Sequence, residues 1–97
     1  DGNTGYYVIT NVNSGKVLDV SGAKMVNGRN VQQYQSNNSL AQRWKIIKNK
    51  DNTYTIASAL DSSYVLDVKG GSKNNGANIQ IYKTNGSKAQ KFTFKKV

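Results

Sequence analysis

The chain has no cysteine, no histidine and no proline among its 97 residues, and none of its five acidic residues is glutamate. Without cysteine no disulfide can stabilise the fold, and without histidine or cysteine there is no cluster for a transition metal. General acid–base catalysis usually needs histidine or a pair of carboxylates with shifted pKa values, so we expect no enzymatic activity. We also expect no cofactor and no calcium loop, because such a loop needs several closely spaced acids.

The chain also lacks long apolar runs. None approaches the roughly 20 residues that a helix needs to cross a bilayer, so we expect no membrane span. Residues 1–4 do not resemble a signal peptide, and we expect any targeting segment to lie outside the sequence. A chain of this length forms at most one domain with a modest core. The nine glycines favour a β protein with many tight turns.

The most informative feature that is present is an internal repeat. Residues 6–49 align with residues 54–97 at a constant offset of 48 with no gap, and 17 of the 44 aligned pairs are identical. Average composition would give roughly three identities, so the chain is one unit written twice. A period of this length indicates symmetric units that cannot each bury an apolar face alone. We therefore expect functional residues at matched positions.

Each unit predicts four short strands and no helix, since no segment has a sustained helical period. Apolar and β-branched runs place these strands at residues 6–10, 16–20, 30–34 and 44–47, and at 54–56, 64–68, 78–82 and 92–94. Asn27-Gly28 and Asn75-Gly76 favour positive φ angles and predict turns only. The sequence therefore predicts an all-β fold.

The third strand of the second unit alternates between apolar and polar side chains. Ile79 and Ile81 are predicted to face the core, so Gln80 and Tyr82 face outward, because successive side chains point to opposite faces. The outward pair is the same in the first unit, where it consists of Gln32 and Tyr34.

Asp19 and Asp67 are the only carboxylates at matched positions, each between apolar residues of a strand. They belong to separate units, which should place them farther apart than the roughly 5 to 9.5 Å that glycoside hydrolysis requires. Two roles stay open for them. They can accept hydrogen bonds from backbone amides of the following glycine-containing loop, or contact a ligand together with the outward glutamine and tyrosine.

The motif Gln42-Arg43-Trp44, matched by Gln90-Lys91-Phe92, closes each unit. It follows Leu-Asp-Val, Asn-Gly and Gln-x-Tyr in the same order in both copies, and this pattern resembles the ricin B-type lectin family over nearly the whole chain. The resemblance implies a β-trefoil, a pseudo-threefold barrel with a hairpin cap that serves as a carbohydrate-binding module. It also implies one domain over residues 1–97, with repeats at 5–52 and 53–97, in a secreted or extracellular protein of bacterial character.

The resemblance assigns the same roles in each unit. An aspartate accepts hydrogen bonds from sugar hydroxyls, a glutamine and an asparagine add polar contacts, and a tyrosine ring packs against the apolar face of the sugar. These residues are Asp19, Gln32, Tyr34 and Asn37 in the first unit, and Asp67, Gln80, Tyr82 and Asn85 in the second. A structural role in the core or on backbone groups is expected for Gln42, Trp44, Gln90 and Phe92. Alternatively, the tyrosines cover the edge of the core.

The identity of the ligand is left open. Galactose-binding members commonly have an asparagine where this chain has Ala41 and Ala89, so galactose itself is not implied. A net charge of +9 favours acidic glycans, whereas the presence of only two arginines argues against specific nucleic-acid binding. Two alternatives are a structural or interaction trefoil without sugar binding, and a basic module that binds polyanions through its lysines alone.

A trefoil has three units, and this chain has two. Either the sequence is part of a longer protein, or copies of the chain associate so that units from different chains complete the barrel. Three chains of two units would supply six units, enough for two whole trefoils, which makes a homotrimer one hypothesis for the assembly.

Overall fold

A computed structural model describes residues 5–95, and predictions that concern residues 1–4 or 96–97 lie outside this range. The described residues contain six strands: β1 (Val17–Val20), β2 (Arg29–Tyr34), β3 (Trp44–Lys48), β4 (Tyr54–Ser58), β5 (Tyr64–Val68) and β6 (Ile79–Lys83). They also contain four single-turn 3₁₀ helices: η1 (Ser21–Ala23), η2 (Leu40–Gln42), η3 (Lys69–Gly71) and η4 (Lys88–Gln90). The predicted all-β class is confirmed.

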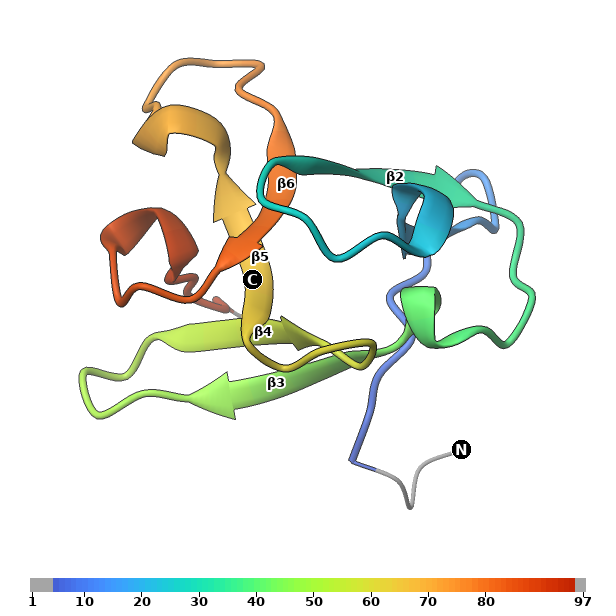
Figure 1. Ribbon diagram of the computed structural model, residues 1–97, viewed down its shortest axis with the longest axis horizontal. Coiled ribbons are helices and arrows are strands. Elements are labelled where there is room, and N and C mark those ends of the chain that lie inside the picture. Colours follow the sequence, from blue (N-terminus) through green and yellow to red (C-terminus); the bar gives the residue numbers. More distant parts are fainter. Residues whose placement is uncertain (1–4, 96–97) are drawn as a thin grey trace.

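The strands form one antiparallel sheet in the order β1-β2-β6-β5-β4-β3. Figure 1 shows the sheet curling from β2 through β6 and β5 to the β3–β4 hairpin. The β1–β2 hairpin belongs to the first unit and the β5–β6 hairpin to the second, while β3 and β4 join the two units. The internal repeat therefore appears as two matched hairpins on a shared, curved sheet.

The core lies where the two units meet. Trp44 is fully buried at its centre, and its indole Nε1 donates a hydrogen bond to Leu18 O at 3.3 Å. Ile81 is also fully buried, because Arg29 and Leu66 flank it on the two neighbouring strands. The remaining buried members of the cluster are Val20, Ala41, Ile56 and Leu66.

Two of the predicted strands are wrong. Residues 6–10 and 92–94 form only isolated bridges, in which Tyr7 pairs with Trp44, Thr10 with Val17, and Phe92 with Tyr54. The regular strands β3 and β4 pair with each other along their whole length across the junction between the units. Residues 92–94 and 6–10 hold the matched positions but have no such hairpin partner within residues 5–95. Regular pairing therefore does not develop there.

The units also meet through Asn27-Gly28. The backbone N–H of Gly28 donates to Ile81 O at 2.9 Å, and Asn27 Oδ1 accepts from the backbone N–H of Lys83 at 2.8 Å. Asn78 Nδ2 donates to Asn30 Oδ1 at 2.6 Å, which joins two matched residues 48 positions apart. The prediction that Asn27-Gly28 forms a turn only is therefore wrong, because this segment also links the two units.

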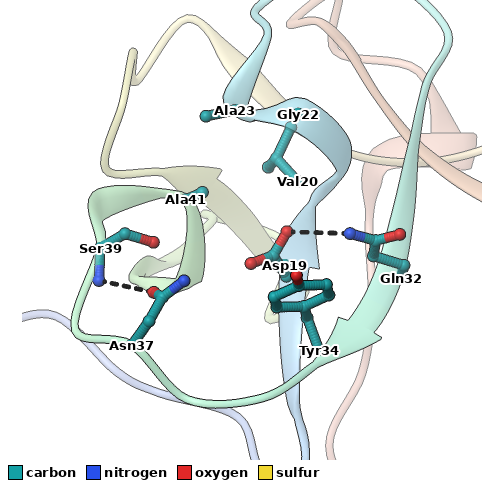
Figure 2. Close-up of a pocket in the computed structure, with 9 residues that line it drawn as sticks. All are labelled: Asp19, Val20, Gly22, Ala23, Gln32, Tyr34, Asn37, Ser39 and Ala41. Atoms are coloured by element: carbon teal, nitrogen blue, oxygen red, sulfur yellow. Dashed lines mark hydrogen bonds between the residues drawn. The ribbon is translucent and has the colours of Figure 1, made fainter.

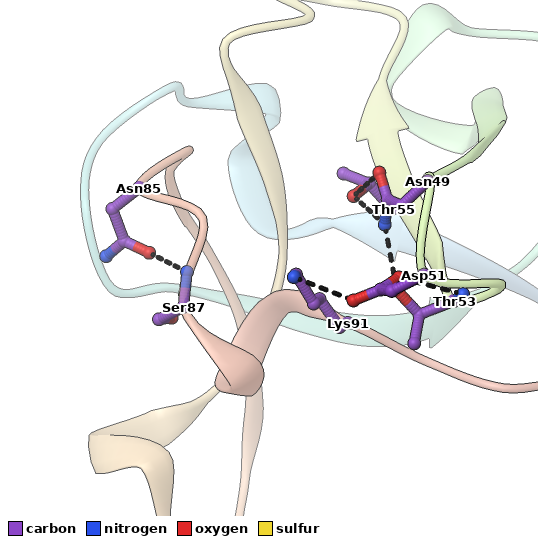
Figure 3. Close-up of polar contacts among 7 residues, drawn as sticks. All are labelled: Asn49, Asp51, Thr53, Thr55, Asn85, Ser87 and Lys91. Carbon is purple, nitrogen blue, oxygen red and sulfur yellow. Dashed lines mark hydrogen bonds and ion pairs between the residues drawn. The ribbon is translucent and has the colours of Figure 1, made fainter.

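The turn between β3 and β4 contacts the end of the second unit (Figure 3). Asp51 Oδ2 pairs with Lys91 Nζ at 3.0 Å, and Asp51 Oδ1 accepts from the hydroxyl and the backbone N–H of Thr53. The Thr53 hydroxyl, followed by the Lys91 ammonium, holds the pKa of Asp51 well below its usual value. Asn49 connects the same turn to the hydroxyls of Thr53 and Thr55.

Candidate functional site: two matched pockets

The first pocket lies on the β1–β2 hairpin. Asp19 is directly opposite Gln32 in the hairpin register, and Tyr34 follows two residues later on the same face of β2. With Asn37 these side chains line a cavity of about 360 Å³. Figure 2 shows how they are arranged. The other lining residues are Val20, Gly22, Ala23, Ser39 and Ala41.

The second pocket repeats this arrangement on the β5–β6 hairpin. Asp67 is opposite Gln80, and Tyr82 follows on the same face of β6. With Asn85 they line a cavity of about 470 Å³. The other lining residues are Gly70, Gly71, Ser87, Lys88 and Ala89. The structure thus brings each predicted set of four residues together and keeps the two sets in separate pockets.

A hydrogen-bond network fixes the carboxylate of the first pocket. Asp19 is only 6% exposed; its Oδ1 accepts from Gln32 Nε2 at 3.3 Å and its Oδ2 from Gln42 Nε2 at 2.8 Å. The buried Gln42 also donates to Gln35 O at 2.9 Å and accepts from the backbone N–H of Asn37 at 2.9 Å. One glutamine therefore holds together the aspartate, the end of β2 and the loop that carries Asn37.

The second pocket contains the same network. Asp67 Oδ1 accepts from Gln80 Nε2 at 3.1 Å, and Asp67 Oδ2 accepts from Gln90 Nε2 at 3.0 Å. Gln90 also donates to Lys83 O and accepts from the backbone N–H of Asn85. Within the described residues, both aspartates thus bond to glutamine side chains. The alternative in which they bond to backbone amides of the following loop is wrong.

The predicted site residues differ in how far they reach solvent. Tyr34 is 53% exposed and Tyr82 is 37% exposed, so both rings are accessible from their pockets. Gln80 faces away from the core isoleucines but is only 5% exposed, because it packs against the carboxylate that it hydrogen-bonds. Trp44 and Phe92 line neither pocket. The indole of Trp44 is part of the core cluster, and the phenyl ring of Phe92 packs against that cluster.

Several lining residues were not singled out from the sequence. Gly22 and Gly70 both have a φ of +66°, a left-handed conformation that favours glycine, and each forms the tight turn after its aspartate. Ser39 lines the first pocket and Ser87 the second. All four are identical at the 48-residue offset, so the repeat contains a signal for them. Lys88 has no such signal, because the matched residue is Leu40.

Residues 5–95 contain no group of three or more His, Cys, Asp or Glu side chains that could hold a metal ion. No helix within the same range is long and apolar enough to cross a membrane.

Several solved structures resemble the chain. The designed threefold-symmetric protein ThreeFoil is 33% identical with a TM-score of 0.90, over 96% of this chain and 66% of that chain. An exo-β-1,3-galactanase from Clostridium thermocellum is 33% identical with a TM-score of 0.88, over 96% of this chain and 20% of that chain. The β-trefoil lectin of the Vibrio vulnificus hemolysin/cytolysin, solved with N-acetyl-D-lactosamine bound, shares the fold at 22% identity and a TM-score of 0.70, over 94% and 63% of the two chains. The chain spans 66% or less of the length of each of these three.

No curated protein sequence matches the chain. The family described as ricin-type β-trefoil lectin domain-like matches residues 1–82. Together with the trefoil neighbours, the curled six-stranded sheet identifies the fold as a partial β-trefoil, as predicted. The chain therefore belongs to the ricin-type β-trefoil lectin-like domain family.

Proposed function

We propose that this chain is a non-catalytic module that binds oligosaccharides or polysaccharides through its two shallow pockets. One observation carries the proposal: each unit places a carboxylate, two amide side chains and an exposed tyrosine ring around a cavity at matched positions. The lectin-like family supports carbohydrates as the class of ligand.

The chemistry of the first pocket suits a sugar ring. A pyranose presents fixed hydroxyl groups and a face of C–H bonds that can pack on an aromatic ring. Each oxygen of Asp19 accepts one hydrogen bond within the protein and retains a lone pair for a sugar hydroxyl. The half-exposed ring of Tyr34 offers the stacking surface. Asn37 Oδ1 accepts from the backbone N–H of Ser39 at 3.0 Å, which orients the side-chain amide of Asn37.

The proposal is tested with Tyr34→Ala, Tyr82→Ala and the double variant, after a glycan array has identified a ligand. Calorimetric titration should show that each single change removes one of two sites and that the double change abolishes binding. Tyr7→Ala is the matched control, because Tyr7 is 55% exposed but lines neither pocket. If the double variant binds as tightly as the parent, the two pockets are not the binding sites.

The alternative functions predict different results. A structural or interaction trefoil gives no hit on the array. A general polyanion binder binds heparin and nucleic acid alike, and its binding to both weakens as salt is added. The tyrosine substitutions do not change that binding. Under our proposal the net charge of +9 adds a salt-sensitive attraction to acidic glycans without replacing the pockets.

We further propose that the module, with repeats at 5–52 and 53–97, tethers a larger extracellular bacterial protein to its glycan. The similarity to 20% of the length of a galactanase supports this arrangement, because there too the trefoil is a small part of a longer chain. The regions that flank this segment in its own gene test the proposal. We expect them to encode a secretion signal and a further domain, and a cytoplasmic protein without either would contradict the proposal.

A third unit is proposed to cover the open side of the sheet. A groove of about 450 Å³ on this side exposes apolar residues such as Leu18, Val31 and Ile79. The first unit docks on the second through Asn27-Gly28, whereas the matched Asn75-Gly76 has no hydrogen-bond partner in another unit within residues 5–95. The contact is therefore head-to-tail. A further unit would bind Asn75-Gly76 of the second unit and place its own matching turn against the first unit.

This third unit comes either from continuation of the chain or from other copies, as in the homotrimer that would complete two trefoils. Light scattering of the 97-residue protein distinguishes the two sources. A mass of three chains of 10.6 kDa supports the trimer, and the mass of a folded monomer excludes it.

A further inference from the structure

The two pockets differ in one charge. Their aspartate, glutamine, tyrosine, asparagine and serine residues are identical, but the second pocket is also lined by Lys88. The matched residue of the first unit, Leu40, is half exposed and does not line the first pocket. The second pocket is also the larger, about 470 Å³ against about 360 Å³, and has Gly71 where the first has Ala23.

We propose that the second pocket binds a sugar that carries an acid group, such as a uronic acid, whereas the first pocket binds a neutral sugar. This difference in ligand between the two pockets rests on the proposed carbohydrate-binding function. It assigns the recognition of the acid group to Lys88, and not to the general positive charge of the protein.

The ammonium group of Lys88 is available for a ligand. It makes no hydrogen bond or ion pair with the described residues, whose one ion pair joins Lys91 to Asp51 at 3.0 Å. A lysine carries a compact charge on a flexible stem, so it can reach an acid group at the rim of a pocket without fixed geometry. Asp67 is buried and held by two glutamines, so sugar hydroxyls would face Asp67 while the acid group faces Lys88.

The first pocket lacks a comparable cation in its lining. A basic group beside the pocket is Arg29, whose Nε donates to Ser21 O at 2.6 Å in the turn that contains Gly22. Arg29 packs against this turn and is not among the lining residues of the pocket. An acid group in the first pocket would therefore meet the carboxylate of Asp19 without a compensating charge, which disfavours it.

Two methyl glycosides that differ only at C6 provide the probe. The methyl glycoside of galactose carries a hydroxymethyl group at C6, and the methyl glycoside of galacturonic acid carries a carboxylate there. Amide signals in ¹⁵N-correlated NMR spectra report each pocket separately, with Gly70 and Gly71 in the second and Gly22 and Ala23 in the first. At low salt we expect the galacturonate to shift the second set at lower concentration than the galactoside, and to act only weakly on the first set.

Two reciprocal substitutions test the assignment to one residue. Lys88→Leu should weaken galacturonate binding in the second pocket about two- to fivefold, as is typical of an exposed ion pair, and should weaken the galacturonate more than the galactoside. Leu40→Lys should give the first pocket a similar gain for the acid. Lys50→Leu is the control: it removes the same charge from the exposed β3–β4 turn, outside both pockets.

The outcomes separate this inference from the proposed function. If both sugars bind both pockets equally, or if Lys50→Leu weakens the galacturonate as much as Lys88→Leu, the inference is wrong while carbohydrate binding stands. A preference for the acid in the first pocket that Arg29→Ala removes would also overturn it. If neither sugar shifts either set of amides, the inference is wrong, and a glycan array without any hit would then contradict the proposed function as well.

Discussion

Replacing Gly22 with alanine should destabilise the protein more than the same change at Gly70. Both glycines have a φ of +66° and each forms part of a matched pocket, so the backbone strain of an added Cβ is the same. A residue with a Cβ in the left-handed region costs roughly 1–2 kcal/mol. Gly70→Ala should cost this amount and no more, because its new Cβ would meet nothing within 4 Å.

At Gly22 a second cost is added. The new Cβ would lie 2.6 Å from Nη2 of Arg29, so the guanidinium must move. Movement breaks the hydrogen bond from Arg29 Nε to Ser21 O, which is worth about 1 kcal/mol. Gly22→Ala should therefore lower the free energy of unfolding by roughly 2–3 kcal/mol, about 1 kcal/mol more than Gly70→Ala.

Urea unfolding followed by the fluorescence of the single tryptophan measures these differences, provided that the denaturant slope m is unchanged. The double variant Gly22→Ala/Arg29→Ala isolates the clash. In the Arg29→Ala background the cost of Gly22→Ala should fall to that of Gly70→Ala, a coupling of about 1 kcal/mol. Equal costs at the two glycines in the parent background, or no coupling with Arg29, would refute the reasoning.

Three further predictions concern the core and the networks. Gln42→Ala and Gln90→Ala should each cost about 2–3 kcal/mol in urea unfolding, because each leaves a buried carboxylate oxygen without its donor; a large difference between them would contradict the equivalence of the two networks. Trp44→Phe should cost about 2 kcal/mol by circular dichroism, since a smaller ring leaves space in the core and the indole donor is lost. Asp51→Asn should lower Tm above about pH 4 and have progressively less effect below it. The pKa of folded Asp51 is depressed, so its contribution is present above the unfolded pKa and is lost as the pH falls through the folded one.

The resemblance to the lectin family predicted the grouping of the site residues, and strand alternation alone predicted that Gln32 and Tyr34 share a face. The structure adds the register, in which the β1–β2 hairpin sets Asp19 opposite Gln32. Both relations lie within one hairpin. The repeat extends them to the second unit, where Asp67 and Gln80 are paired in the same way.

The features that could not be predicted depend on contacts between units. The core position of Ile81 was predicted from the alternation along its strand, but the exposure of its counterpart Gln33 was not. Ile81 has neighbouring strands on both sides, whereas Gln33 pairs only with Leu18. Residues 6–10 and 92–94 carry strand-forming side chains but lie where no described hairpin partner exists. Strand propensity depends on such neighbours, so the pattern of one unit cannot decide these positions.

The position of Asp19 in the network also decides which variants can report on function. Asp19 is buried and accepts from two glutamines, one of which anchors the loop that carries Asn37. Replacing Asp19 would remove the carboxylate acceptor of one N–H on each glutamine, so a loss of binding would be indistinguishable from a collapse of the pocket. Tyr34 lies outside this network and is half exposed, so its truncation removes contact surface for a ligand while the hydrogen bonds below it persist. For this reason the tyrosine variants separate recognition from folding, whereas the aspartate variants combine the two.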